Sequence, residues 1–162
     1  MRKYIVIAVL IAAVLAIPLW VSAGDSKPVS YPENYRDWSH IKSMVINPEH
    51  ALADPFEGIH HIYANSAAKD GLKSGQYKDG AVLVFDLLSQ NVSGDAIQEG
   101  ERKFIGVMEF DAKRFAQTGG WGFEAFAGDS KSQRVVEDGG VSCFGCHQAV
   151  KADGYVFTKP RD

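Results

Sequence analysis

A short segment near the carboxyl end carries the residues with the most specific chemistry. Between Val141 and His147, two cysteines stand three positions apart, and a histidine directly follows the second. This is the C-x-x-C-H pattern of c-type haem attachment. The two thiols can bond to the two vinyl groups of one porphyrin, while the neighbouring imidazole binds its iron. We therefore predict one covalent haem c per chain, attached through Cys143 and Cys146, with His147 as the axial iron ligand.

Three other uses of a close cysteine pair are a disulfide, a thioredoxin-like redox pair and half of a zinc site. A disulfide between these two residues would close a very short loop and stabilise the fold little. The sequence has no second cysteine pair and no His-x-x-x-His cluster to complete a tetrahedral zinc site. A thioredoxin-like pair is expected near a βαβ unit, which the sequence around Cys143 does not indicate. The histidine after the second cysteine favours haem.

The group on the other side of the iron separates an electron carrier from a ligand-binding or catalytic haem. Candidates for a sixth ligand are Met44, Met108, His40, His50, His60 and His61. Both methionines sit in apolar patterns typical of core residues. His60 and His61 point to opposite faces if they lie on a strand, so at most one can face a pocket. Spacing alone selects none of the six.

The amino-terminal segment predicts export. Two basic residues precede an apolar run from Ile5 to Val21, and small residues suited to a signal peptidase follow. We predict a signal peptide at residues 1–23, a linker at 24–31 and one haem domain at 32–162. The alternative is an uncleaved membrane anchor, since spanning lipid takes roughly 20 apolar residues. In both cases the domain is expected to be periplasmic, because c-type haem is attached outside the cytoplasm.

The composition fits one globular domain and argues against a nucleic-acid partner. The chain has 162 residues, of which 46% are hydrophobic and 23% charged, and its formal net charge is −3. Binding to nucleic acid or to an anionic membrane needs a concentrated basic face, and the sequence shows no basic stripe. We therefore expect no nucleic-acid partner, and no membrane contact unless the amino-terminal segment is retained.

Hydrophobic patterning predicts the elements that position the haem segment. An amphipathic helix is expected over 35–44, a capped helix over 65–75 and one helical turn over 112–116. Apolar or alternating segments predict strands at 59–64, 81–88, 103–110 and 121–126, and Asp79-Gly80 marks a turn. This order predicts an α+β, mainly β fold, with an antiparallel sheet, a few flanking helices and a C-terminal haem attachment segment.

Other groups of residues accompany the haem motif in a characteristic order. They are Pro32 to Trp38, Tyr77 to Gly80, Lys113 to Phe115, Gly120 to Phe123, and Tyr155 to Thr158. On these residues the chain, from Tyr31 onwards, resembles the cytochrome P-460 and cytochrome c′-beta family. The resemblance implies a mainly antiparallel β fold, a single haem with five-coordinate iron, and a homodimer.

The resemblance implies two functions, which differ at one position. Cytochrome P-460 proteins oxidise hydroxylamine with a haem crosslinked to a lysine, five residues beyond the glycine of the Asp-Gly turn. Here Phe85 takes that place. The c′-beta branch lacks the crosslink and binds NO and CO, and Phe56 matches the other aromatic of its distal face. His60 corresponds to a distal-side basic position of the enzyme branch, and we assign it no catalytic role.

The resemblance to the c′-beta branch therefore predicts a periplasmic mono-haem cytochrome with an apolar distal pocket that binds NO and CO. Two phenyl rings offer no hydrogen-bond donor to bound O₂, which carries partial negative charge, whereas NO and CO bind without one. The alternatives are hydroxylamine oxidation and electron transfer with a methionine or histidine sixth ligand. The expected partners are the gaseous ligand, a second copy of the chain, and an electron donor or acceptor protein.

Overall fold

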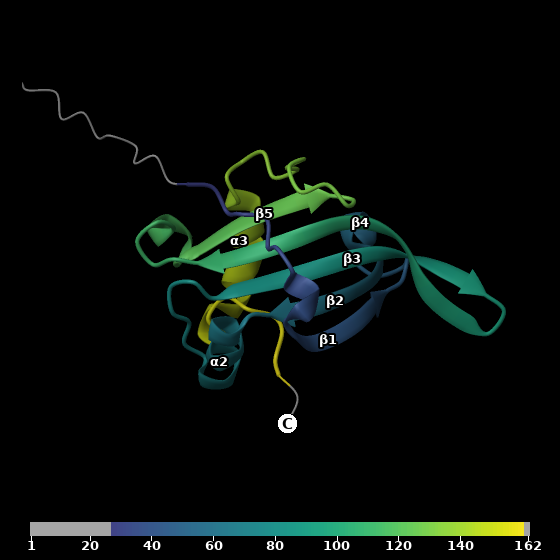
Figure 1. Cartoon of the computed structure of the whole chain (residues 1–162), viewed down its shortest axis with the longest axis horizontal. Coiled ribbons are helices and arrows are strands. Elements are labelled where there is room, and N and C mark those ends of the chain that lie inside the picture. Colours follow the sequence, from purple (N-terminus) through teal and green to yellow (C-terminus); the bar gives the residue numbers. More distant parts are fainter. Residues whose placement is uncertain (1–26, 161–162) are drawn as a thin grey trace, which may run out of the picture.

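The computed structural model describes residues 27–160, which form a five-stranded antiparallel sheet whose strands lie side by side in chain order (Figure 1). The strands are β1 (Ser39–Ile46), β2 (Gly58–Ala64), β3 (Val82–Ser93), β4 (Ala96–Phe110) and β5 (Trp121–Ala127). With 37% of residues 27–160 in strands and 24% in helices, the predicted mainly β class with an antiparallel sheet is confirmed. All four predicted strands are present.

Within the described part of the chain, six short helices flank this sheet. They are η1 (Tyr35–Asp37), α1 (Ala53–Phe56), α2 (Ser66–Ser74), η2 (Ala116–Thr118), α3 (Val141–His147) and η3 (Gln148–Asp153). The predicted helix over 65–75 is α2. Its cap forms as the sequence suggests, because the Asn65 side chain accepts a hydrogen bond from the Ala68 amide at 2.9 Å. The predicted helical turn is present at residues 112–115, where the Phe115 amide donates a hydrogen bond of 3.0 Å to the Asp111 carbonyl, and the 3₁₀ helix η2 follows it directly.

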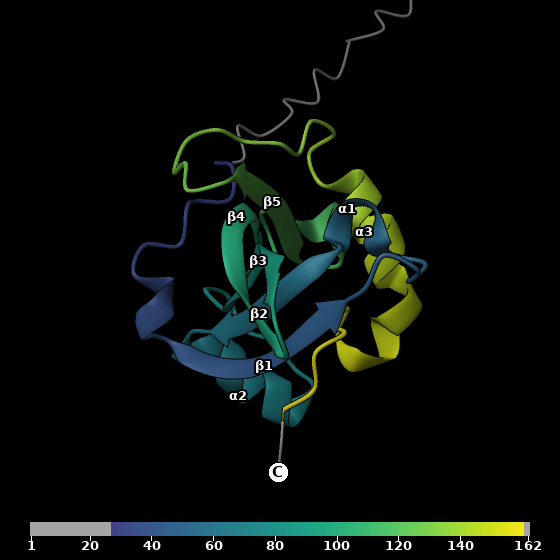
Figure 2. The ribbon, with the colours of Figure 1, turned by 90° about the vertical axis from the view of Figure 1, so that its right-hand side faces the viewer.

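The period-two alternation of the strands gives the sheet two packed faces. One face carries a core built on Ile62, Leu83 and Phe123, and α2, α3 and the C-terminal segment cover part of it. The other carries a core built on Val84, Ile105 and Phe126, which the segment around Val29 and Tyr35 covers. Figure 2 shows α1 and α3 on the same side of the sheet. We call that side the α3 face and the other the N-terminal face.

The predicted helix over 35–44 is wrong. Only Tyr35–Asp37 is helical, and the chain then enters β1, which pairs with β2. Apolar residues at spacings of three and four misled the prediction, because a β-bulge between His40 and Lys42 interrupts the two-residue alternation of this strand. Pairing with β2 therefore overrides the local pattern, and His40 lies on a strand, not on a helix.

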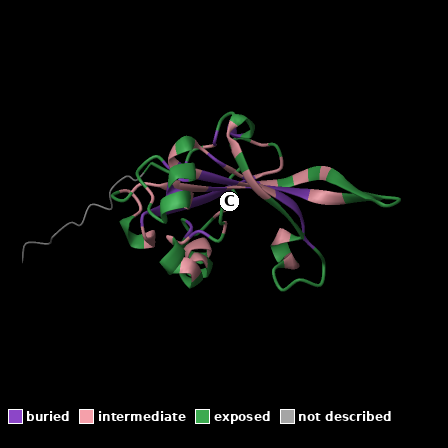
Figure 3. Cartoon of the chain, turned by 90° about the horizontal axis from the view of Figure 1, so that it is seen from below, coloured by how far each residue is buried: buried purple, intermediate pink, exposed green. Residues whose placement is uncertain are grey.

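Strands β3 and β4 extend well past their predicted ends and form a hairpin. Ser93 pairs with Ala96 across a two-residue turn, in which Gly94 has a φ of 60°. A glycine followed by aspartate suits such a tight turn, because positive φ costs glycine little. The distal part of this hairpin projects beyond the other strands, and Figure 3 shows that its residues are exposed.

The predicted signal peptide at residues 1–23 lies outside the described residues. In the segment predicted as a linker, residues 27–31 have no regular secondary structure, yet Val29 is buried and Tyr31 packs edge-on against Phe126. Within residues 27–160, no helix has the length and apolar character needed to cross a membrane.

Candidate functional site

Helix α3 presents the cysteines and the histidine of the predicted haem segment. Asp138 fixes the start of this helix, because its carboxylate accepts hydrogen bonds from the amides of Gly140 and Ser142 at 2.9 and 2.8 Å. Gly140 has a φ of 89°, and a Cβ atom there would lie 2.9 Å from the Cβ of Phe123. Only glycine therefore lets the helix begin so close to β5.

Both cysteines are free in the structure. Cys143 is half-buried and packs against the core of the α3 face, whereas Cys146 is exposed. Burial raises the pKa of the Cys143 thiol. Residues three apart share one side of a helix, so both sulfur atoms are presented on the same side of α3.

His147 is held in the orientation and protonation state of a metal ligand. Its Nδ1 lies 2.7 Å from the carbonyl oxygen of Tyr155. A carbonyl oxygen only accepts, so Nδ1 carries the proton and the lone pair is on Nε2. Iron-binding histidines are commonly oriented in this way by a hydrogen bond from the other ring nitrogen. Burial also lowers the pKa of His147, which favours the neutral form that binds metal.

Two aromatic rings fix the plane of the His147 imidazole. The ring of Phe123 on β5 lies 5.0 Å from it, and the ring of Phe157 lies 5.1 Å from it, edge-on. The Trp121 indole donates a hydrogen bond of 2.9 Å to the Gly154 carbonyl, which anchors the chain just before Tyr155. The sequence did not single out Tyr155 for this role, because its backbone oxygen makes the contact and its side-chain type gives no signal.

The two phenylalanines predicted for the distal pocket lie together on the α3 face. Phe56 of α1 and Phe85 of β3 have ring centroids 5.8 Å apart, and the ring of Phe104 on β4 lies within about 6 Å of both. His60 joins them, because its imidazole stacks on the Phe85 ring at 4.4 Å. We call Phe56, His60, Phe85 and Phe104 the aromatic cluster. Sequence reasoning missed Phe104, which alternation along β4 places on this face.

His60 has no hydrogen-bond partner among the described residues, although it is only 6% exposed. Its Nδ1 is fully enclosed and unsatisfied. Burial, and to a smaller extent the neighbouring His61, lowers the pKa of His60 to about 4, so the ring is neutral at physiological pH. Buried polar atoms usually have partners, so an unsatisfied imidazole indicates a site where a ligand or water completes the structure.

The other candidate sixth ligands differ from His60. The ring of His61 lies between the Ser43 hydroxyl and the Glu99 carboxylate, each 2.6 Å from one of its nitrogens. His40 also contacts Ser43, and His50 accepts a hydrogen bond from the Leu52 amide. Met108 packs beside the core of the α3 face, as expected of a core residue. Met44 is 48% exposed, so its expected core placement is wrong.

The α3 face fits a large apolar group. Met44 pairs with His60 across strands β1 and β2, and it remains half exposed beside the aromatic cluster. Phe157, in contact with His147, is 52% exposed. Large apolar side chains beside an unsatisfied buried imidazole suit a porphyrin, which is mostly apolar but offers polar groups at the iron. No group of three or more His, Cys, Asp or Glu residues able to hold a bare metal ion occurs within 27–160.

The N-terminal face carries a buried carboxylate that the sequence analysis missed. Asp86 of β3 is completely buried and accepts hydrogen bonds from the Tyr35 hydroxyl, the Arg36 guanidinium and Arg102 Nε, at 2.7 to 2.8 Å. Burial opposes its ionisation, but the hydrogen bonds and the two positive charges outweigh this effect and lower the pKa of Asp86. A single acidic residue inside the apolar run from Val82 to Leu88 was the available signal.

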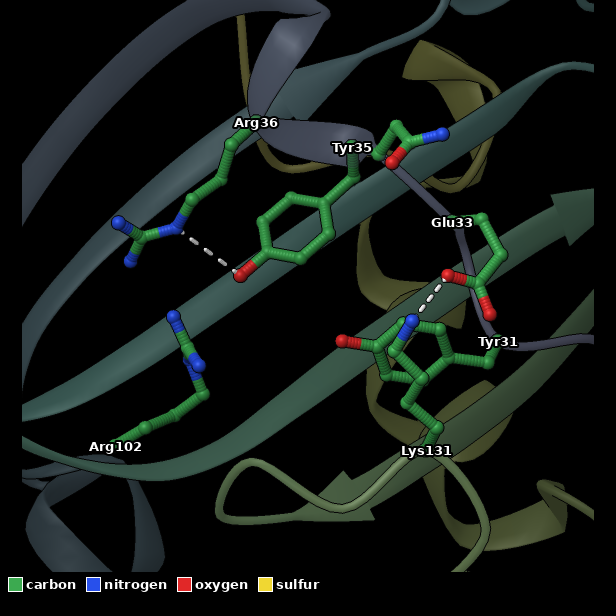
Figure 4. Close-up of a pocket in the computed structure, with 7 residues that line it drawn as sticks. Tyr31, Glu33, Tyr35, Arg36, Arg102 and Lys131 are labelled. Carbon is green, nitrogen blue, oxygen red and sulfur yellow. Dashed lines mark hydrogen bonds and ion pairs between the residues drawn. The ribbon is translucent and has the colours of Figure 1, made fainter.

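The three side chains that donate to Asp86 also line an open cavity of about 220 Å³ (Figure 4). Tyr31, Glu33, Asn34, Tyr35, Arg36, Arg102 and Lys131 line it. Lys131 pairs with Glu33, and Arg102 pairs with Asp129 as well as with Asp86. The cations of the cavity are thus matched by carboxylates, and the arrangement acts as a structural ion-pair network.

Comparison with known families agrees with this geometry. The family model for cytochrome P460 matches residues 32–158, which include β1 to β5, the aromatic cluster and helix α3. A search of curated proteins finds no match. The family match supports a haem cofactor with iron. Since the match spans far more than half of the sequence, the chain belongs to the cytochrome P460 family.

Proposed function

We propose that this protein is a mono-haem c-type cytochrome that binds NO and CO at a five-coordinate iron. One observation carries the choice between gas binding and hydroxylamine oxidation: Phe85, packed against Phe56, occupies the sequence position where crosslinked relatives have lysine. A phenyl ring cannot form the crosslink, because it has no amine.

Three residues of α3 have separate tasks in this proposal. Cys143 and Cys146 would hold the porphyrin through their sulfur atoms. His147 would hold the iron through Nε2, because its Nδ1–H is already donated to the Tyr155 carbonyl at 2.7 Å. The haem supplies an iron atom that binds a diatomic ligand at its remaining position.

The aromatic cluster forms the distal wall in this proposal. The rings of Phe56, Phe85 and Phe104 contact one another through their faces and edges. They offer no strong iron ligand, so the sixth position stays open to a gas. They also keep bulk water away, which disfavours charged ligands relative to neutral NO and CO.

Absorption spectroscopy of the matured protein tests this function. Adding CO to the reduced protein is expected to shift the Soret band, and ordinary c-type absorption is expected in its absence. A strongly red-shifted ferrous band together with an extra protein-to-haem mass link would instead place the protein in the hydroxylamine-oxidising class. His147→Ala is expected to remove the proximal ligand and change the spectrum, whereas His50→Ala, at an exposed loop position, is the matched control.

A second candidate is an electron-transfer cytochrome with His60 as its sixth ligand. The specific observation in its favour is the absence of any hydrogen-bond partner for the His60 ring among described residues. A low-spin ferric spectrum at neutral pH that changes in His60→Phe would establish this candidate and displace gas binding.

The proposed setting is the periplasm, with the protein acting as a homodimer that exchanges electrons with a donor or acceptor protein. The amino-terminal apolar run supports export, and the family resemblance supports the dimer. The intact mass of the mature protein reports whether residues 1–23 are removed. Light scattering during size-exclusion chromatography reports the oligomeric state, and a monomeric mass would contradict the dimer.

A further inference from the structure

Four polar side chains on the N-terminal face form a continuous chain of contacts that the proposed haem site does not use. The Glu99 carboxylate lies 2.6 Å from Nε2 of His61, and Nδ1 of the same ring lies 2.6 Å from the Ser43 hydroxyl oxygen. That hydroxyl oxygen also lies 2.9 Å from Nε2 of His40. We call these four residues the Ser43 cluster. Strands β1, β2 and β4 contribute to it, so pairing in the sheet brings its members together.

Strand pairing and ring packing hold the two histidines beside the hydroxyl group. Ser43 and His61 are directly opposite each other on β1 and β2, so their side chains share one face of the sheet. The His40 ring packs edge-on against the rings of His61 and Tyr63, with centroid distances of 5.7 and 5.6 Å. The hydroxyl group therefore lies between two imidazoles that have packing contacts of their own.

The direction of each hydrogen bond follows from the carboxylate. A carboxylate oxygen and an unprotonated ring nitrogen would repel each other at 2.6 Å, so the neutral His61 ring carries its proton on Nε2. The oxygen lies out of line with this N–H bond, so Glu99 acts on the ring as a nearby negative charge. Nδ1 of His61 then accepts a hydrogen bond from the Ser43 hydroxyl, whose oxygen accepts one from His40 Nε2. One imidazole is thus placed to take the hydroxyl proton, and the other donates to the same oxygen.

The nucleophile of this cluster is accessible, whereas its base is largely enclosed. Ser43 and His40 are exposed, but the His61 side chain is only 15% exposed. A serine hydroxyl is a weak nucleophile unless an adjacent base takes its proton, and His61 is positioned as such a base. Because the hydroxyl is exposed, few contacts hold a substrate there, so the site suits small esters with a good leaving group.

We propose that Ser43 is a nucleophilic serine that accepts the acyl group of small carboxylic esters, on the sheet face opposite the aromatic cluster. Ser43 Oγ forms a bond to the carbonyl carbon of the ester, and the bond from that carbon to the alcohol oxygen breaks. The hydroxyl proton moves to His61 Nδ1 and from there to the leaving alcohol. The Glu99 carboxylate stabilises the imidazolium formed in between, and His40 supplies an N–H donor beside the reacting oxygen. This activity is separate from gas binding and does not depend on it.

Labelling of the mature protein with diisopropyl fluorophosphate, followed by peptide mass spectrometry, tests the nucleophile. The phosphorus–fluorine bond of this probe breaks as phosphorus bonds to Ser43 Oγ, and fluoride leaves. Ser43 is expected to carry the adduct. Ser93, which is exposed on the hairpin and pairs with Ala96, is the internal control and is expected to carry none. Ser43→Ala is expected to abolish both the label and the burst of 4-nitrophenolate released from 4-nitrophenyl acetate.

Substitutions of the other members separate an activated serine from an ordinary one. His61→Gln removes the base, so the labelling rate of Ser43 is expected to fall about a hundredfold. Glu99→Gln removes a half-exposed carboxylate and is expected to slow labelling by about two- to fivefold. Glu99→Asp keeps the negative charge and is expected to recover part of that loss. His50→Gln, at an exposed loop position, is the matched control and is expected to change nothing.

If His61→Gln yields too little protein, the wild type at acidic pH provides the same test, because a doubly protonated His61 cannot act as a base. Labelling of Ser43 is then expected to stop.

Three results would overturn the proposal. Labelling of Ser43 no faster than that of Ser93 would mean that the hydroxyl is not activated. An adduct on either imidazole would make a histidine the nucleophile. Labelling that His61→Gln or acid leaves unchanged would show that the contacts are only structural. None of these results bears on the gas-binding proposal, because the Soret shift with CO reports on the haem.

Discussion

Two histidines that are adjacent in the sequence have opposite environments in the structure. His61 points to the N-terminal face, where Ser43 and Glu99 each lie 2.6 Å from one of its ring nitrogens. His60 points to the α3 face and has no partner among the described residues. The pattern extends to the two faces as a whole, since Asp86 on the N-terminal face receives hydrogen bonds from three side chains. The buried carboxylate of the N-terminal face is therefore fully paired, whereas the buried imidazole of the α3 face has no polar partner among residues 27–160.

Removing the proposed haem attachment gives the largest expected effect. The double substitution Cys143→Ala with Cys146→Ala removes both proposed attachment points, so haem is expected to be absent from the denatured polypeptide. Haem staining after denaturing electrophoresis and the intact mass measure this loss. Ser142→Ala, one residue from the motif, is the control and is expected to retain haem. Covalent haem in the double variant would show that the attachment assignment is wrong.

The second-largest effect is expected from breaking the ion-pair network around Asp86 on the N-terminal face. Asp86→Asn leaves Arg102, which is only 16% exposed, without its buried counter-charge. The free energy of unfolding is expected to fall by about 3–5 kcal/mol. Asp129→Asn removes the partner of Arg102 that is 82% exposed, and is expected to cost less than about 1 kcal/mol. Chemical denaturation measures both, and equal losses would mean that burial of the carboxylate does not matter.

Lowering the pH is expected to reduce the free energy of unfolding through His60 on the α3 face. Its pKa falls from 6.5 in the unfolded chain to about 4 in the fold, so the unfolded state binds the proton first as pH decreases. Stability is therefore full above pH 6.5 and declines down to about pH 4, by roughly 3 kcal/mol in total. His60→Phe is expected to lack this part of the decline. Unfolding curves between pH 7 and pH 4 for both proteins measure the difference, and parallel curves would contradict the shift.

Opening the aromatic cluster is expected to have a smaller effect on stability. Phe85→Ala removes ring contacts to Phe56, Phe104 and His60, and is expected to cost about 2 kcal/mol because the side chain is only partly buried. Flash photolysis is expected to show faster CO association than in the wild type, since the distal wall is less filled. An unchanged association rate would mean that Phe85 does not border the ligand site.

The smallest effect is expected at His61. His61→Gln alters contacts to Ser43 and Glu99, both of which are near the surface, and is expected to change stability by less than about 1 kcal/mol. The C–O stretching frequency of the ferrous CO complex is expected to equal that of the wild type, since His61 lies on the face of the sheet away from α3. A shifted frequency would mean that His61 borders the ligand site.

Much of this arrangement could be predicted from the sequence. The alternation of β2 predicted that His60 and His61 would diverge, and the structure confirms it. Local patterns also predicted α2 and the strands from β2 to β5. The first strand could not be predicted, because the bulge at His40 disguises its alternation and pairing with β2 decides its conformation. The Asp86 network was also beyond reach, since Arg36 and Arg102 lie 50 and 16 residues away in the sequence.

The contact between His147 and the Tyr155 carbonyl has a consequence for evolution and engineering. A peptide oxygen is present whatever side chain stands at that position, so point substitutions at residue 155 leave the acceptor in place. The electronic character of the imidazole therefore depends on the path of the main chain. The hydrogen bond from the Trp121 indole to the Gly154 carbonyl fixes that path. If His147 holds the iron as proposed, changing the iron potential through this contact requires a different path of the C-terminal segment, for example by insertions or deletions after η3.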